Sequence, residues 1–197
     1  IMDVFSKVFQ FKITLNGTKP PVWRRIQVPD TYTFYDLHVA IQDAMGWTDT
    51  HLHEFTIQHP QKMREVNIGI PDDDALDFGR VVLEGWSNKI ADFFRENNKK
   101  ALYVYDFGDY WEHKIEFEGV FPKDPSKNYP VCTAGRRACP PEDCGGPWMY
   151  MHLLRGDHPS QEKYADFDPV NFDPKEVYFE DPQVRFDLMS DLLDYEE

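Results

Sequence analysis

With 197 residues, 41% of them hydrophobic and 15% aromatic, the chain has ample material for a folded core and lies outside the range of disordered proteins. Its formal net charge is −14, and residues 157–197 alone carry 13 acidic and 3 basic side chains. Such an acidic surface repels phosphate backbones, which disfavours general nucleic-acid binding.

The length predicts a single α+β domain over residues 1–197, with a core at 5–156 and an acidic, helical C-terminal extension at 157–197. No apolar run reaches about 18 residues, so no membrane span is expected. The N-terminus shows no basic stretch followed by an apolar one, so no secretory signal is expected. Three cysteines in such a chain indicate reduced thiols and a cytoplasmic location.

The beginning of the chain predicts the order strand, strand, helix, strand. Hydrophobic periodicity places these elements at residues 9–15, 22–28, 33–45 and 51–58. Thr33 can cap the helix with Asp36 three residues later, and Gly46 is placed to end it in a left-handed conformation. This order begins α+β folds with a mixed or antiparallel sheet and helices packed on one side.

The stretch 101–117 predicts the central hairpin. Residues 101–107 are rich in β-branched and aromatic side chains, and from Trp111 to Phe117 apolar residues alternate with charged ones. Gly108 and its flanking aspartates suit the turn between the two strands. One face of the second strand, which includes His113, is therefore expected to be buried.

Weaker patterns fill the rest of the chain. A long surface loop with a turn at 71–74 is expected over 60–77, and an ordered loop without regular structure over 129–146. The predicted elements are a short strand at 81–83, helical turns at 88–97, and helices at 147–154 and 184–193.

Six motifs occur together and in order: residues 20–26 (PPVWRRI), Leu37-His38 with Ile41-Gln42, Gly46-Trp47, residues 51–55 (HLHEF), residues 103–111 with His113, and residues 139–146 (CPPEDCGG). The combination resembles the plasmid Orf-three-like family, first described from a root-inducing plasmid and widespread in bacteria and archaea. The resemblance covers roughly residues 5–180. It implies a link to mobile elements and no specific reaction, and no carboxylate set of the transposase type is present.

The cysteine loop is one candidate metal site. Cys132, Cys139 and Cys144 are good zinc ligands in thiolate form, and one histidine (His51, His53, His113 or His152) would complete four ligands. Their spacings of seven and five residues differ from common zinc sites, so thiols that pack a rigid loop, with a disulfide between Cys139 and Cys144 under oxidation, are the simpler interpretation.

A second candidate gathers five side chains at one end of the sheet: His51, His53, Asp106, Asp109 and His113. Such a cluster could bind zinc or another divalent metal and activate water, with His53, Asp106, Asp109 and His113 as the catalytic candidates. Histidine–carboxylate bonding that only orients strand ends is the more economical alternative.

The preferred hypothesis is a non-enzymatic binding or adaptor module with an unidentified protein partner. Its expected recognition surface comprises Trp23, Arg24, Arg25, Trp47, Tyr110 and Trp111. One of the two arginines must point inward, where it needs a carboxylate or a bound anion, and pairing with a carboxylate is the preferred expectation. The alternative function is a metal-dependent hydrolase or nucleic-acid-processing accessory, so the sequence leaves open whether the protein is an enzyme.

Overall fold

The computed structural model of the protein describes residues 5–71 and 80–194, and side chains as far as residue 190. Its elements are β1 (Lys7–Leu15), β2 (Trp23–Pro29), α1 (Phe34–Met45), β3 (His53–Gln58), β4 (Glu65–Gly69), β5 (Val82–Glu84), α3 (Ile90–Phe93), β6 (Lys100–Tyr105), β7 (Trp111–Pro122), β8 (Val131–Arg136), α4 (Gly146–Arg155) and α5 (Pro182–Asp194). Short 3-10 turns lie at Gln161–Tyr164 and Pro174–Glu176. Within this part of the chain, no helix is both long and apolar enough to span a membrane.

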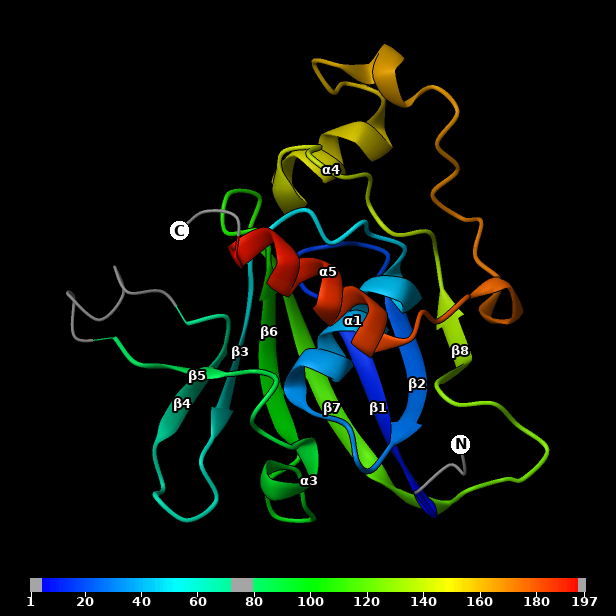
Figure 1. Ribbon diagram of the computed structural model, residues 1–197. Coiled ribbons are helices and arrows are strands. Elements are labelled where there is room, and N and C mark those ends of the chain that lie inside the picture. Colours follow the sequence, from blue (N-terminus) through cyan, green and yellow to red (C-terminus); the bar gives the residue numbers. More distant parts are fainter. Residues whose placement is uncertain (1–4, 72–79, 195–197) are drawn as a thin grey trace.

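One mixed sheet organises the described residues. Its strand order is β5-β4-β3-β6-β7-β1-β2-β8. The β4–β5 pair is parallel, and every other pair of neighbours is antiparallel. Figure 1 shows α1 and α5 on the same side of this sheet, and the two helices contact each other. The predicted α+β class and the strand-strand-helix-strand start are confirmed.

The predicted central hairpin is β6 and β7, which pair from Tyr105 opposite Trp111. Between Trp111 and Phe117 of β7 the apolar positions are buried and the charged ones are partly exposed, because successive side chains of a strand point to opposite faces. β7 also pairs along the whole length of β1, so the hairpin lies in the middle of the sheet.

Helix α1 begins and ends where the sequence predicts. The Thr33 hydroxyl accepts a hydrogen bond from the Asp36 amide, and the Asp36 carboxylate accepts one from the Thr33 amide. Gly46 ends the helix with a φ of 104°, a conformation that glycine adopts at little cost. The apolar stripe of the helix is buried against the sheet, and this packing fixes the position of its polar residue His38.

Two of the expected loops contain strands. The loop expected over 60–77 contains β4, and the turn expected at 71–74 lies largely outside the described residues. The loop expected over 129–146 contains β8, whose small residues pair with β2 at the edge of the sheet. Both predictions were wrong because pairing with a neighbouring strand overrides weak local preference.

Removing the cap of α1 tests the local account of this helix. We expect Thr33→Ala to lower the free energy of unfolding by about 1 kcal/mol, because the Asp36 amide loses its hydrogen-bond acceptor. Urea unfolding measures the change. The exposed Thr31 provides the control, and an equal loss in Thr31→Ala would contradict the assignment of the cap.

Candidate functional site

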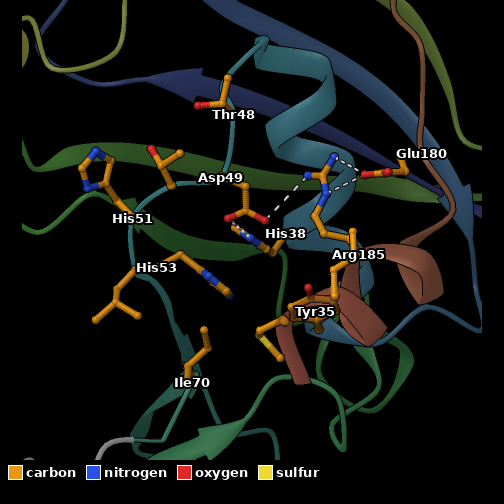
Figure 2. A pocket seen from close by; sticks show the side chains of 13 residues that line it. Tyr35, His38, Thr48, Asp49, His51, His53, Ile70, Glu180 and Arg185 are labelled. Carbon is orange, nitrogen blue, oxygen red and sulfur yellow. Dashed lines mark hydrogen bonds and ion pairs between the residues drawn. The ribbon is translucent and has the colours of Figure 1, made fainter. Parts of the chain in front are cut away.

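A cleft of about 780 Å³ lies between the start of β3, helix α1 and helix α5 (Figure 2). Its lining residues are Tyr35, His38, Thr48, Asp49, Thr50, His51, Leu52, His53, Ile70, Glu180, Arg185, Leu188 and Met189. The aliphatic members lie just before β3, just after β4 and on α5, whereas most of the polar groups come from the segment between α1 and β3. This volume falls in the range of small-molecule sites, roughly 300–1,000 Å³.

Two histidine rings are stacked beside this cleft. His38 on α1 and His53 at the start of β3 have ring centroids 3.4 Å apart and planes inclined by 7°. Both side chains are almost completely buried. His53 Nε2 has no hydrogen-bond partner among the described residues, although a buried polar atom without one is costly. This unsatisfied nitrogen makes the cleft floor the strongest candidate for a binding site.

A chain of hydrogen bonds holds His38 in one orientation. Its Nε2 lies 2.8 Å from Asp49 Oδ1, and its Nδ1 lies 2.8 Å from the Tyr103 hydroxyl. The Gln42 amide nitrogen donates to the same hydroxyl, while Gln42 Oε1 accepts from the Asp49 backbone. Three elements, α1, β6 and the segment before β3, therefore position this one ring.

Burial decides the charge of His53. Removal from water, with a smaller contribution from neighbouring His38, lowers the pKa of His53 well below its usual value. The ring is therefore neutral near pH 7. A neutral imidazole with a strongly depressed pKa is a poor general base at that pH, but it has the protonation state in which histidine binds ligands.

Arg185 connects α5 to the cleft. Its guanidinium contacts Asp43 at 2.8 Å and Glu180 at 2.7 Å, and its Nη1 lies 3.7 Å from Asp49 Oδ2. The Phe186 ring packs edge-on against Tyr35 of α1. Three carboxylates share one guanidinium, so this wall of the cleft carries an excess of negative charge.

The structure divides the five-residue cluster expected from the sequence. His53 joins His38 and Asp49, whereas His51 points away from them (Figure 2) and lies 3.0 Å from Asp143 and 3.7 Å from Asp106. Asp109 accepts a hydrogen bond from the Gly145 backbone. The five side chains do not converge in one pocket, because Asp106 accepts from the Gly108 amide of its own turn and Asp109 bonds the loop before α4.

His113 lies in the core of the sheet, away from the cleft lining. Its Nδ1–H donates to the Tyr103 carbonyl at 3.2 Å, and its ring packs edge-on against Trp47. Burial lowers the pKa of His113 to about 4. The metal-ligand and catalytic roles considered for His113 receive no support from this position, and the alternative of a core histidine describes it.

The structure does not bring the cysteines together with a histidine in the described part of the chain. Of the groups of three or more close donor side chains found there, none contains a cysteine. Cys132, Cys139 and Cys144 are free thiols, and burial raises the pKa of each, that of Cys144 to about 12. These raised pKa values fit the simpler interpretation, in which the thiols pack the loop.

The expected recognition surface is not assembled either. Trp47 and Trp111 are buried, because their rings pack against each other in the core at 5.8 Å. Trp23 is half-buried on the sheet, and Tyr110 is exposed. Arg25 is the arginine that points outward, and it forms an ion pair with Glu118.

Arg24 is the inward arginine, but its partners are not carboxylates. Its side chain donates to the backbone carbonyls of residues 23, 44 and 136, and the Phe172 ring covers it at 3.5 Å. Burial lowers its pKa to about 10. The expected carboxylate partner was therefore wrong, since carbonyl groups at strand and helix ends satisfy most of its donors.

The sequence analysis missed His38 and Asp49 as members of a site. Both lie near motifs that carry the family resemblance, His38 inside Leu37-His38 and Asp49 just after Gly46-Trp47. A polar histidine on the apolar stripe of a helix was the available signal, because such a residue needs partners when it is buried.

Comparison with known proteins places these residues in a family. The model of the plasmid pRiA4b ORF-3-like protein family matches residues 7–181. The chain belongs to this family. The family match includes His38, Asp49 and His53 and ends one residue before α5, so the cleft floor lies inside the family region and α5 lies outside it.

Two relatives agree with this assignment. The uncharacterized protein y4hQ of Sinorhizobium fredii is 36% identical over 163 residues, which cover 82% of this chain and 79% of that protein. The crystal structure of MM3350, a protein of unknown function from Methanosarcina mazei Go1, has a TM-score of 0.81 and 44% sequence identity. The match covers 89% of this chain and 99% of the other.

The depressed pKa of His113 predicts a pH dependence of stability. In the unfolded chain the His113 ring takes up a proton below about pH 6.5, whereas in the folded protein it does so only below about pH 4. The free energy of unfolding therefore falls as the pH decreases from about 6.5 to about 4. Between pH 7 and pH 5 we expect the wild type to lose about 2 kcal/mol more than His113→Gln. Urea unfolding at both pH values measures this difference.

Ile115→Val provides the control, because it alters the same buried face of β7 without removing a titratable group. This variant should show the wild-type pH dependence at a lower overall stability. Equal pH dependence in the wild type and His113→Gln would contradict a neutral, buried His113.

Proposed function

We propose that the protein is a non-enzymatic binding module whose ligand occupies the cleft between β3, α1 and α5. The observation that carries this proposal is the cleft floor, where the buried His53 Nε2 lacks a partner inside a cavity of about 780 Å³. Small-molecule sites combine such a cavity with a few converging polar groups. The three free thiols also support our proposal of a cytoplasmic location.

The lining of the cleft indicates the chemistry of the ligand. Leu52, Ile70, Leu188 and Met189 offer apolar surface, and Leu52 and Leu188 are 51% and 60% exposed. Exposed large apolar side chains that line a cavity favour a ligand with an apolar body. Because Asp43, Asp49 and Glu180 outnumber Arg185, we propose that this body carries a positive or neutral group.

This proposal moves the recognition site away from the surface expected from the sequence. Trp47 and Trp111 of that surface are buried, so they cannot anchor a partner without unfolding part of the core. The cleft, in contrast, is open to solvent and combines apolar with charged groups. A protein partner that inserts a basic side chain would meet the same chemistry.

Two probes of opposite charge test this ligand class. Phenethylamine and 3-phenylpropionate share one apolar body, and we expect only the amine to shift the backbone amide signals of residues 48–53 and 183–190 in nitrogen–proton correlation spectra. Leu188→Trp should weaken amine binding about tenfold, because an indole occupies part of the cavity.

Val184→Trp is the matched control, since Val184 is exposed on the same helix and does not line the cleft. It should leave amine binding unchanged. Equal shifts with both probes, or shifts scattered away from the cleft, would contradict the proposal.

A further inference from the structure

We infer that the floor of the cleft is a binding site for a divalent transition-metal ion, with His38, Asp49 and His53 as its protein ligands. The inference rests on the proposed function in one respect, that the cleft is the binding site of the protein. It adds a specific ion class and names the ligand atoms. Two imidazoles and one carboxylate form a set that suits zinc and similar ions.

The positions of the donor atoms support this inference. One atom each from His38, Asp49 and His53 lies within 4.8 Å of the others. Two of these residues are buried, and Asp49 is half-buried at the cleft. The site is therefore enclosed by protein on one side and reachable through the cleft on the other, which leaves room for a further ligand.

His53 is the most direct indication of an ion. Its side chain is only 3% exposed and lines the cleft, yet its Nε2 has no partner among the described residues. If the His53 ring only filled space, an apolar side chain would serve equally well at this position. A buried nitrogen without a hydrogen-bond partner, in contrast, lowers the stability of the folded protein. An ion beside His38 and Asp49 would satisfy this nitrogen.

The hydrogen bonds behind His38 resemble the supporting shell of a metal site. Gln42 Oε1 accepts from the Asp49 amide, so the Gln42 nitrogen must donate to the Tyr103 hydroxyl. The Tyr103 hydroxyl lies 2.8 Å from His38 Nδ1 and can donate its proton to this nitrogen. A metal-bound histidine commonly donates from its second nitrogen to a fixed acceptor, and the Tyr103 oxygen is placed to be that acceptor when His38 carries its proton on Nδ1.

The hydrogen bonds on either side of His38 show which proton would have to move if an ion bound. In the neutral His38 ring, Nδ1 accepts from Tyr103, so the proton sits on Nε2 and is donated to Asp49. An ion on Nε2 requires this proton to move to Nδ1, from which it can be donated to the Tyr103 oxygen. The stacked rings must also tilt apart, because an ion about 2.0–2.1 Å from both nitrogens lies between their planes.

A second group of possible metal ligands lies on the other side of the segment between α1 and β3. His51, Asp106 and Asp143 also bring three donor atoms within 4.8 Å of one another. There His51 Nε2 is already hydrogen-bonded to Asp143 at 3.0 Å, and the Asp143 side chain is 65% exposed. This group lacks a buried nitrogen without a partner, so we assign the ion to the cleft floor.

Metal titration of the full-length, untagged, metal-free protein tests the assignment. Calorimetry with zinc should show one ion per chain. His53→Ala and Asp49→Asn should each weaken binding more than roughly 100-fold, since even loss of a supporting residue costs 10–100-fold. The control is His51→Ala, which removes a neighbouring histidine outside the assigned site and should bind zinc like the wild type.

Two further measurements guard against variants that fail to fold. Thermal unfolding should show that metal-free Asp49→Asn retains the cooperative transition of the wild type. In the wild type, histidine nitrogen spectra should show His38 protonated on Nε2 without metal and on Nδ1 with zinc. Zinc binding that leaves His38 unchanged, or that is lost in His51→Ala, overturns the inference.

The outcomes separate this inference from the proposed function. If zinc does not bind while phenethylamine still shifts the cleft signals, the metal site is refuted and the binding module stands. If zinc binds as described but neither organic probe reaches the cleft, the ion class is supported and the proposed organic ligand is wrong.

Discussion

The packing of α1 against the sheet is the contact on which the candidate site depends. The apolar stripe of α1 is buried, and this places His38 directly over His53 at a ring separation of 3.4 Å. The sheet fixes the position of His53, because the strand that carries it, β3, pairs with β4 and β6 on its two edges. A shift of α1 along the sheet would separate the two rings, so the geometry of the cleft floor follows from the core.

The polar part of the site is built on the same contact. Tyr103 of β6 and Gln42 of α1 meet behind His38, and the Asp49 amide closes the chain of hydrogen bonds. Helix α5 covers one side of the cleft. Its Arg185 is held in place by ion pairs with Asp43 and Glu180. The floor therefore belongs to the region shared with the ORF-3-like family, whereas the wall from α5 lies beyond the matched residues.

Local patterns predicted much of the fold. The capping box of Thr33 and the alternation along β7 were clear signals, since both depend on residues close in sequence. The strand β8 was missed because its partner β2 lies about 100 residues earlier in the chain. The strand β4 was missed because its own sequence carries a weak strand signal, although it pairs with the adjacent strand β3.

The site was harder to predict than the fold. The sequence indicated His53 as a candidate, but it grouped His53 with the wrong partners. His51 and His53 alternate along the chain, yet His51 precedes β3 and turns toward Asp143, while His53 faces α1. The metal site can be located by anomalous diffraction at the zinc edge, from crystals of the zinc-loaded protein. We expect one peak between His38, Asp49 and His53. A peak only beside Asp143 or the cysteines, or no peak, would rule out a metal site at the cleft floor.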